Sequence, residues 1–224
     1  MRLLPLCLIA LMAAPARAEP PNLSARPGGG SGAVARLAMA QRLQDRALQS
    51  GDMVMLLTAI RLARAVVLRP ASGWQKQTTA TPAPDAPQGR PAAPDPAGPG
   101  VLALAQGMAG DDPGLQDLVY DLDAQLPRER PASAVSTASD LAGGAADVWQ
   151  MAFFGESPAE LALIGDGDGP LDLTVTDAAG NLICADLSPR AVKACAFTPA
   201  RNGFFTLTIS NRSTLVASYR LIGT

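Results

Sequence analysis

The chain has no histidine and only two lysines, Lys76 and Lys193, among its 224 residues. Without histidine, the Ser-His-Asp and Cys-His catalytic systems and histidine-built zinc sites are excluded. A serine–lysine pair would need one of the two lysines as its base. The sequence places Lys76 in a linker and Lys193 on a surface strand or loop, with no motif nearby that would activate either side chain. We therefore expect a protein that is not an enzyme.

Aromatic side chains and excess positive charge are also scarce. Aromatic residues make up 4% of the chain, which leaves few platforms for stacking on sugars, and we expect Trp149 to lie in a core. The formal net charge of -2 gives no basic field that would follow a phosphate backbone, so no nucleic-acid partner is expected. Glycoside cleavage by a pair of carboxylates is not excluded, because four acidic residues could converge in the fold: Glu156, Glu160, Asp166 and Asp168.

The first eighteen residues are typical of a secretory signal peptide. Arg2 precedes an apolar run from Leu3 to Ala14 that is too short to span a bilayer, and Ala16-Arg17-Ala18 follows. We expect cleavage after Ala18 and a mature protein that is soluble in the periplasm or outside the cell. A lipoprotein anchored at Cys7 is the alternative, but the residues before this cysteine lack the small side chains that lipid modification needs.

Two cysteines, Cys184 and Cys195, remain after signal cleavage. A lone pair in an exported chain predicts a disulfide bond. Closing a loop of about ten residues stabilises a fold by roughly 2 to 3 kcal/mol in the loop-entropy model. A redox pair or a metal thiolate site is the alternative, and the absence of C-x-x-C spacing and of histidine disfavours it.

Residues 33–69 predict a helical hairpin that follows a flexible segment, residues 19–32. The first helix covers Ala33 to Gln49. Gly51 suits its end and Asp52 suits the N-cap of a second helix, whose apolar stripe continues until a proline at position 70.

A second helical hairpin is predicted at residues 101–126. Its two helices are separated by Gly110-Asp111-Asp112-Pro113, and the apolar stripe of its second helix includes Leu118. The two hairpins could pair into a small four-helix unit. Tandem repeats of the tetratricopeptide kind are the alternative, and ordinary packing of apolar stripes is favoured because the two copies share little beyond their Gly-Asp breaks.

Two segments have the composition of linkers. Residues 70–100 include TPAPDAPQGRPAAPDPAGPG, a Pro/Ala-rich stretch with little to bury, and they predict an extended spacer. Residues 127–144, PRERPASAVSTASDLAGG, predict a second linker.

Residues 145–224 predict an all-β sandwich of the jelly-roll kind, so the fold class is multi-domain α plus β. The apolar period changes to two, and Gly, Pro, Asn and Asp separate short runs. The predicted strands are residues 147–154, 159–164, 171–176, 181–185, 192–197, 204–210 and 215–222.

The sandwich segment carries a set of motifs in a fixed order: Leu171-Asp172-Leu173, Asp177 to Asn181, Thr198-Pro199, Gly203-Phe204 and Asn211 to Tyr219. As a set, these motifs resemble the bacterial pre-peptidase C-terminal domain, over roughly residues 145–224. The resemblance implies a β-sandwich that acts as an accessory module, and it leaves the helical half unmatched.

Some relatives of that family bind calcium, and three carboxylates here, Asp166, Asp168 and Asp172, are the corresponding candidates. Carboxylates and backbone carbonyls are the ligands that Ca²⁺ prefers, and glycine lets a loop fold tightly around an ion. Pro170 stands where the family loop often has another acidic residue. The alternative is a polar turn with solvated carboxylates.

These features together predict an exported, non-catalytic binding protein of the cell envelope or exterior, with an unknown protein or glycan partner. The alternative function is a carbohydrate-binding or calcium-dependent accessory to a secreted hydrolase.

Overall fold

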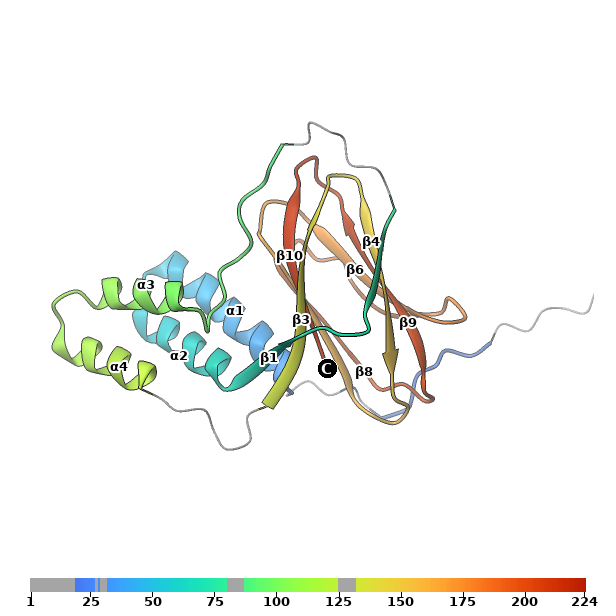
Figure 1. Cartoon of the computed structure of the whole chain (residues 1–224), viewed down its shortest axis with the longest axis horizontal. Coiled ribbons are helices and arrows are strands. Elements are labelled where there is room, and N and C mark those ends of the chain that lie inside the picture. Colours follow the sequence, from blue (N-terminus) through green and yellow to red (C-terminus); the bar gives the residue numbers. More distant parts are fainter. Residues whose placement is uncertain (1–18, 27, 29–31, 80–86, 125–131) are drawn as a thin grey trace, which may run out of the picture.

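A computed structural model of the chain describes residues 19–26, 28, 32–79, 87–124 and 132–224. The predicted signal peptide and its cleavage site lie outside these residues. The described chain combines four helices with two five-stranded β-sheets, which confirms the α plus β class and the sandwich (Figure 1). None of the described helices is long and apolar enough to cross a membrane.

The helices form two hairpins, as the sequence predicts: α1 (Ala33–Ser50), α2 (Met53–Arg64), α3 (Pro99–Ala109) and α4 (Pro113–Asp123). Gly51 ends α1 in the left-handed conformation, with φ of 67°, and Asp52 caps α2 by accepting from the Met55 amide at 2.9 Å. Asp112 caps α4 in the same way. The Gly-Asp breaks in the sequence therefore stop and restart the helices.

The two hairpins pack on each other through one apolar cluster, and in Figure 1 α3 and α4 lie farthest from the strands. The buried members of this cluster are Ala47, Met53, Leu56, Leu57, Ile60, Val101, Leu102, Ala105, Ala109, Val119 and Leu122. The predicted pairing into a four-helix unit is thus confirmed. Leu126, which the sequence adds to the stripe of α4, lies outside the described residues.

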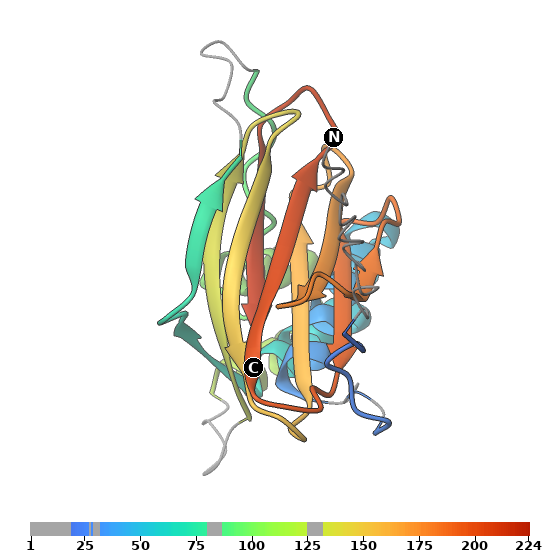
Figure 2. The same cartoon turned by 90° about the vertical axis from the view of Figure 1, so that its right-hand side faces the viewer.

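The strands form two sheets. Sheet A has the order β1-β3-β10-β5-β8 and sheet B the order β2-β4-β9-β6-β7. The strands are β1 (Val66–Pro70), β2 (Gln75–Thr78), β3 (Ala132–Leu141), β4 (Ala146–Phe153), β5 (Ala159–Gly165), β6 (Leu171–Asp177), β7 (Leu182–Asp186), β8 (Val192–Phe197), β9 (Gly203–Asn211) and β10 (Ala217–Gly223). The seven predicted strands correspond to β4 to β10. The described helices lie behind the sandwich in Figure 2, on the side of sheet A.

Both predicted linkers contain strands of the sandwich, and this corrects the sequence-based boundaries. Val66–Pro70 pairs in parallel with β3, although the sequence continues α2 to Pro70. Gln75–Thr78 pairs with β4, and Ala132–Leu141 pairs with β10. The remaining Pro/Ala-rich part of the first linker lies partly outside the described residues, at 80–86. Strand pairing with the distant sandwich overrides the local composition of these segments.

Helix α1 covers the outer face of sheet A, so the two halves share a core. Val34, Leu37 and Ala38 pack against Ala162 and Ile164 of β5. Every residue of β5 is therefore buried, because its inner face lines the sandwich core and its outer face meets the helix. A sequence run buried on both faces loses its alternation, as in β5.

The segment at residues 19–24 is held against the sandwich, although the sequence predicts a flexible lead-in there. The Asn22 amide donates to Asp177 at 2.8 Å, and its side chain exchanges two hydrogen bonds with the backbone of Arg201. The Asn181 side chain donates to the carbonyl of Glu19. The turn from Asp177 to Asn181, one of the motifs of the family resemblance, thus holds residues 19–22 against the sandwich.

Candidate functional site

The three acidic residues predicted to bind calcium are each engaged by the protein itself. Asp166 accepts from the Ser218 amide at 2.6 Å, and Asp168 forms an ion pair with Arg90 Nε at 3.0 Å. Asp172 forms an ion pair with Arg212 Nε at 2.7 Å. The described chain contains no group of three or more Asp, Glu, Cys or His side chains that could hold a metal ion. The geometry does not fit a shared calcium ligand set, and the calcium site stays a prediction.

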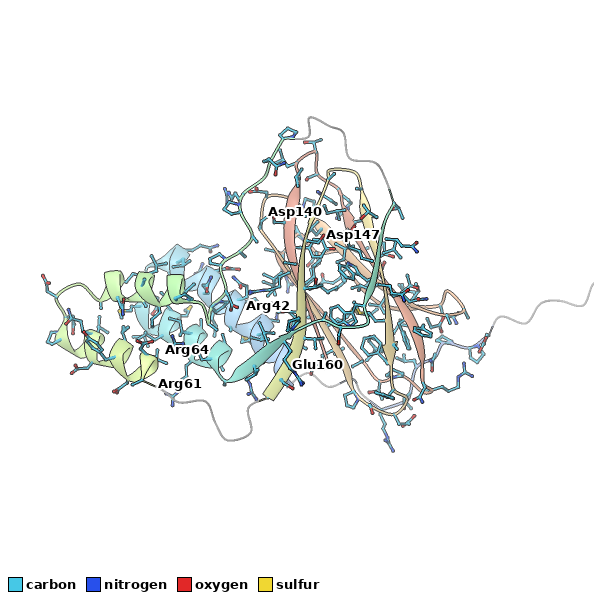
Figure 3. The ribbon with its side chains drawn as sticks, in the orientation of Figure 1. Arg42, Arg61, Arg64, Asp140, Asp147 and Glu160 are labelled. Carbon is cyan, nitrogen blue, oxygen red and sulfur yellow. A yellow bond between two sulfur atoms is a disulfide. The ribbon has the colours of Figure 1, made fainter. Side chains whose placement is uncertain are left out.

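The four carboxylates considered for glycoside cleavage also have separate partners. Glu160 Oε1 and Oε2 accept from the amides of Gly32 and Ala35, at 3.1 and 3.2 Å, and so cap the start of α1. Figure 3 shows Glu160 at this junction between the helices and the strands. Glu156 pairs with Arg26 on the surface. Glu160 therefore stabilises the start of α1, and Glu156 forms a surface ion pair.

The predicted disulfide is present. Cys184 and Cys195 are bonded, with Cα atoms 6.1 Å apart. Cys184 lies on β7 at the edge of sheet B, and Cys195 lies on β8 at the edge of sheet A. The bond therefore joins the two sheets at one side of the sandwich, whereas the sequence left open which neighbouring elements it connects.

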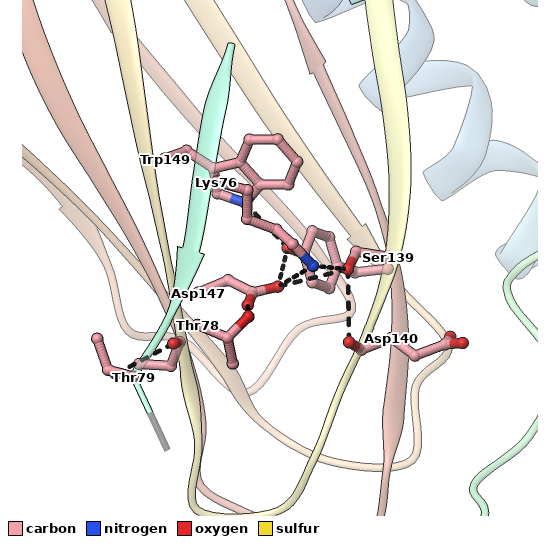
Figure 4. A network of polar contacts seen from close by, with 9 residues as sticks. Lys76, Thr78, Thr79, Ser139, Asp140, Asp147 and Trp149 are labelled. Atoms are coloured by element: carbon pink, nitrogen blue, oxygen red, sulfur yellow. Dashed lines mark hydrogen bonds and ion pairs between the residues drawn. The ribbon is translucent and has the colours of Figure 1, made fainter. Parts of the chain in front are cut away.

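A buried polar network occupies the opposite side, the sandwich margin, where the edge strand β2 of sheet B meets β3 of sheet A (Figure 4). Asp147, which is fully buried, accepts from the hydroxyls of Thr78 and Tyr219, both at 2.5 Å. Tyr219 in turn accepts from the Trp149 indole at 2.9 Å. Lys76 Nζ lies 3.5 Å from Asp147. A buried carboxylate with this many donors is satisfied within the fold.

Lys76 also meets a serine, which brings together the two residue types of a serine–lysine pair. Its Nζ donates to Ser139 Oγ at 2.6 Å. A serine nucleophile needs a base that accepts its proton, whereas this ammonium donates and is paired with the Asp147 carboxylate. Trp149 lies in the core, as the sequence predicts, with Lys76 Nζ 5.8 Å from its ring centroid. The network is suited to closing the sandwich margin.

Burial and the adjacent Asp147 carboxylate raise the pKa of Tyr219 well above its usual range. The phenol thus remains a hydrogen-bond donor at every physiological pH.

Lys193 is buried, with a side chain that is 1% exposed, so the sequence-based prediction that it lies on the surface is wrong. Burial lowers the pKa of Lys193, while Asp186, at 3.8 Å, opposes the shift. Ser188 accepts from its ammonium through the backbone carbonyl.

The helical half carries a groove of about 330 Å³ between α3 and α4. It is lined by Gln106 and Ala109 of α3 and by Gln116, Val119 and Tyr120 of α4. The Tyr120 side chain is 70% exposed, which leaves its ring and hydroxyl available at the rim. The lining is mixed, because two glutamines and a tyrosine hydroxyl accompany the two aliphatic side chains.

Further apolar side chains lie exposed on the same hairpin. Leu118 is 47% exposed, although the sequence places it on the buried stripe of α4, and Leu104 of α3 is 44% exposed. Leu118 and Tyr120 are two residues apart on α4, on either side of buried Val119, so they do not belong to one face of the helix.

This hairpin is also strongly acidic. Residues 99–124 contain no Lys or Arg and five aspartates, Asp111, Asp112, Asp117, Asp121 and Asp123. Only Asp123 forms an ion pair among the described residues, with Arg64 of α2 at 3.4 Å. The hairpin that forms the groove therefore carries net negative charge, which favours a positively charged partner.

The sequence alone revealed neither the margin network nor the α3–α4 groove. Lys76 and Ser139 lie in segments whose composition is that of linkers, although QKQT at residues 75–78 is free of proline and could have indicated a strand. The acidic bias of residues 99–124 was visible in the sequence and would have marked the hairpin as an interaction surface.

Comparison with known proteins places the chain only broadly. No protein-family model matches it, and no curated protein matches. Among solved structures it is similar to the pre-peptidase C-terminal domain of a collagenase from Bacillus anthracis, at 13% identity and a TM-score of 0.35, over 40% of this chain and 87% of that chain. It is also similar to a mitogen derived from Yersinia pseudotuberculosis, at 14% identity and a TM-score of 0.29, over 41% and 84% of the two chains.

A third similar structure is a family GH115 4-O-methyl-α-glucuronidase with specificity for decorated arabinogalactans, at 13% identity and a TM-score of 0.29. The match covers 56% of this chain and 24% of that enzyme. A pre-peptidase C-terminal domain is thus among the structural neighbours, in line with the motif resemblance. At these scores the neighbours carry no argument about function.

Proposed function

We propose that the protein is an exported, non-catalytic interaction protein that binds a basic, partly apolar segment of a partner protein in the groove between α3 and α4. The observation that carries this proposal is the exposed Tyr120 on a hairpin with five aspartates and no basic residue. A groove with an exposed tyrosine ring on an acidic hairpin selects a segment that offers both an apolar anchor and positive charge.

The sandwich then has the role of an accessory module that holds the helices in place. Helix α1 shares its core with sheet A, and the second hairpin packs on the first. A binding hairpin fixed in this way is preorganised, which lowers the entropy lost on binding. Export to the periplasm or the cell exterior is supported by the signal-like first eighteen residues and by the disulfide.

A peptide array with graded net charge tests this proposal. Basic peptides that carry one aromatic or aliphatic side chain should bind the full chain, and binding should weaken as salt rises. Tyr120→Ala should weaken it about tenfold or more, as removal of an aromatic anchor usually does. The matched control is Phe154→Ala, which removes a similarly exposed aromatic side chain directly after β4. Equal loss in both variants, or a preference for acidic peptides, would refute the proposal.

A glycan partner is the second candidate, because of the outer face of sheet B. Thr174 pairs with Thr208 and Thr176 pairs with Thr206 in neighbouring strands, all four half-buried, and Phe204 beside them is 58% exposed. Rows of hydroxyls next to an aromatic ring suit sugar hydroxyls and sugar faces. Binding on a glycan array that is lost in Phe204→Ala and kept in Tyr120→Ala would favour this function over the first.

Calcium would belong to this second function as an accessory ion. Thermal melting with and without calcium tests it: stabilisation of the wild type that is absent in Asp166→Asn with Asp168→Asn would support the loop site. No change at about 5 mM calcium, a concentration above the range of weak extracellular sites, would retire it.

A further inference from the structure

Three arginines line one small groove at the junction of the helices and the sandwich. The groove has a volume of about 210 Å³ and lies between α1 and the chain entering β8. Its walls are Arg42, Asp45, Arg46 and Gln49 of α1, together with Arg190, Ala191 and Val192. Neither the proposed partner groove nor the margin network uses any of these residues.

The local structure brings the arginines together. Arg42 and Arg46 are four residues apart on α1, so they lie on the same face of the helix, one turn apart. Arg42 Nη2 donates to the Val192 carbonyl at 3.4 Å, which places its guanidinium at the start of β8. Arg190 precedes that strand, in the connection from β7. Figure 3 shows Arg42 where α1 meets the strands.

None of the three guanidinium groups is neutralised within the described chain. The eight ion pairs found there involve other cations. Asp45 lines the groove, but its carboxylate accepts from Gln41 Nε2 at 3.0 Å, and burial raises the pKa of Asp45. Arg190 also contributes to lowering the pKa of buried Lys193, after the larger effect of burial. A concentration of unpaired positive charge in an acidic protein favours a bound anion.

We propose that the groove formed by Arg42, Arg46 and Arg190 binds a small oxyanion of the phosphate class, as a free ion or as the phosphoryl group of a larger molecule. The volume is below the roughly 300 to 1,000 Å³ of pockets for drug-sized ligands, so a single small group fits and a whole organic cofactor does not. Arg guanidinium groups bind phosphate and carboxylate oxygens through paired hydrogen bonds.

Phosphate is favoured over a carboxylate because of the number of arginines. A carboxylate carries one negative charge and two oxygens, which one guanidinium satisfies. A phosphoryl group carries about 1.5 to 2 negative charges and three acceptor oxygens, enough for several guanidinium groups at once. Three arginines around one small groove therefore match the larger anion.

Isothermal titration calorimetry of the full chain at low ionic strength tests the site with inorganic phosphate, sulfate and acetate. Arg46→Gln with Arg190→Gln removes two of the three charges and should weaken phosphate binding about tenfold or more, since each charge-assisted hydrogen bond contributes substantially. Arg61→Gln with Arg69→Gln is the control, because it removes the same charge outside the groove. This control should bind phosphate as the wild type does.

The results show whether the site binds phosphate and whether the bound group is a free ion or part of a lipid. A second measurement uses vesicles of phosphatidic acid in phosphatidylcholine, because phosphatidic acid carries a terminal phosphoryl group. Binding to these vesicles that is lost in the same groove variant identifies a lipid headgroup, and binding of inorganic phosphate alone identifies a free ion. No phosphate binding at about 10 mM, which corresponds to affinity weaker than millimolar, overturns the proposal. Acetate binding as tight as that of phosphate, or equal loss in the control variant, overturns it as well. The peptide array is independent of all these results.

Discussion

Asp147 is the residue on which the closure of the sandwich depends. Its carboxylate is fully buried and accepts from a threonine on β2 and a tyrosine on β10, so it joins the two sheets. A buried carboxylate is tolerated because hydrogen bonds and ion pairs from its partners offset the loss of hydration. Removal of the carboxylate, or of one of its donors, leaves the remaining buried group without a hydrogen-bond partner. Each member of the network therefore depends on the others being in place.

Replacement of this carboxylate should destabilise the protein. Asp147→Asn removes the charge opposite Lys76 and places an NH2 group against one of the two hydroxyl donors, so we expect a loss of about 3 kcal/mol in the free energy of unfolding. Urea unfolding followed by tryptophan fluorescence measures it. Asp140→Asn is the control from the same network, because that side chain is exposed and accepts only from the Ser218 hydroxyl, and it should cost less than about 1 kcal/mol. An equal loss of stability in the two variants would show that the burial of Asp147 does not determine the effect of its replacement.

Asp177 predicts a dependence of stability on acid. Burial by itself raises the pKa of Asp177, but hydrogen bonds from Asn181, Asn22 and Ala179 outweigh it, so the pKa lies below the ordinary 3.8. A carboxylate with a lowered pKa stabilises the folded state above pH 3.8, and this contribution is lost as the pH falls through the lowered value. Asp177→Asn should therefore be less stable at pH 7 and lose less stability than the wild type between pH 5 and about pH 2.

Urea midpoints at several pH values measure this difference. Asp117→Asn is the control, because Asp117 is exposed and forms no ion pair among the described residues. If the wild type and Asp177→Asn lose stability in parallel on acidification, the turn from Asp177 to Asn181 is not an acid-sensitive anchor.

At the scale of single elements, neighbours decide what a segment becomes. Val66 and Val67 continue the apolar stripe of α2, but β-branched residues also suit a strand, and pairing with β3 makes them β1. Proline at the end of this strand is tolerated because β1 lies at the edge of sheet A. The Gly-Asp breaks, by contrast, act through local backbone conformation and capping, so they were predictable from the sequence.

The disulfide between β7 and β8 gives a prediction for this pair of strands. Cys184→Ala with Cys195→Ala should lower the free energy of unfolding by about 3 kcal/mol, since the bond closes a loop between residues 11 apart. Urea unfolding with and without dithiothreitol measures it. Reductant should destabilise the wild type by a similar amount and leave the double variant unchanged. A wild type that is insensitive to reductant would contradict the prediction.

At the scale of the whole molecule, the helices and the sandwich are parts of one structure. Sheet A is buried on one face by sheet B and on the other by α1, and Glu160 of β5 caps that helix. The chain also enters the sheets before the predicted sandwich begins, through β1, β2 and β3. Binding surfaces on the helices therefore keep a fixed position relative to those on the strands.

Truncation tests this interdependence. A fragment of residues 145–224 lacks β1, β2 and β3, so β10 and β4 become open edges and Asp147 loses Lys76 and Thr78. We expect this fragment to be unfolded or aggregated under oxidising conditions, as open edges and an unpaired buried charge favour. Circular dichroism and urea unfolding beside the full chain measure the result. A cooperative transition in the fragment would show that the predicted boundary at residue 145 is a true domain limit.

The sequence by itself determined the helix breaks, the seven strands of residues 145–224, the disulfide partners and the buried position of Trp149. These features depend on periodicity, on local caps and on a single pair of cysteines, all of which act over short distances or allow one solution. Only the tertiary structure decided that segments with linker composition supply two strands, β2 and β3, and that β1 replaces the end of a predicted helix. It also decided that Lys193 is buried and that Glu160 caps a helix. It also brought Arg42, Arg46 and Arg190 to one groove. Each of these depends on contacts between residues far apart in the chain, which local patterns do not encode.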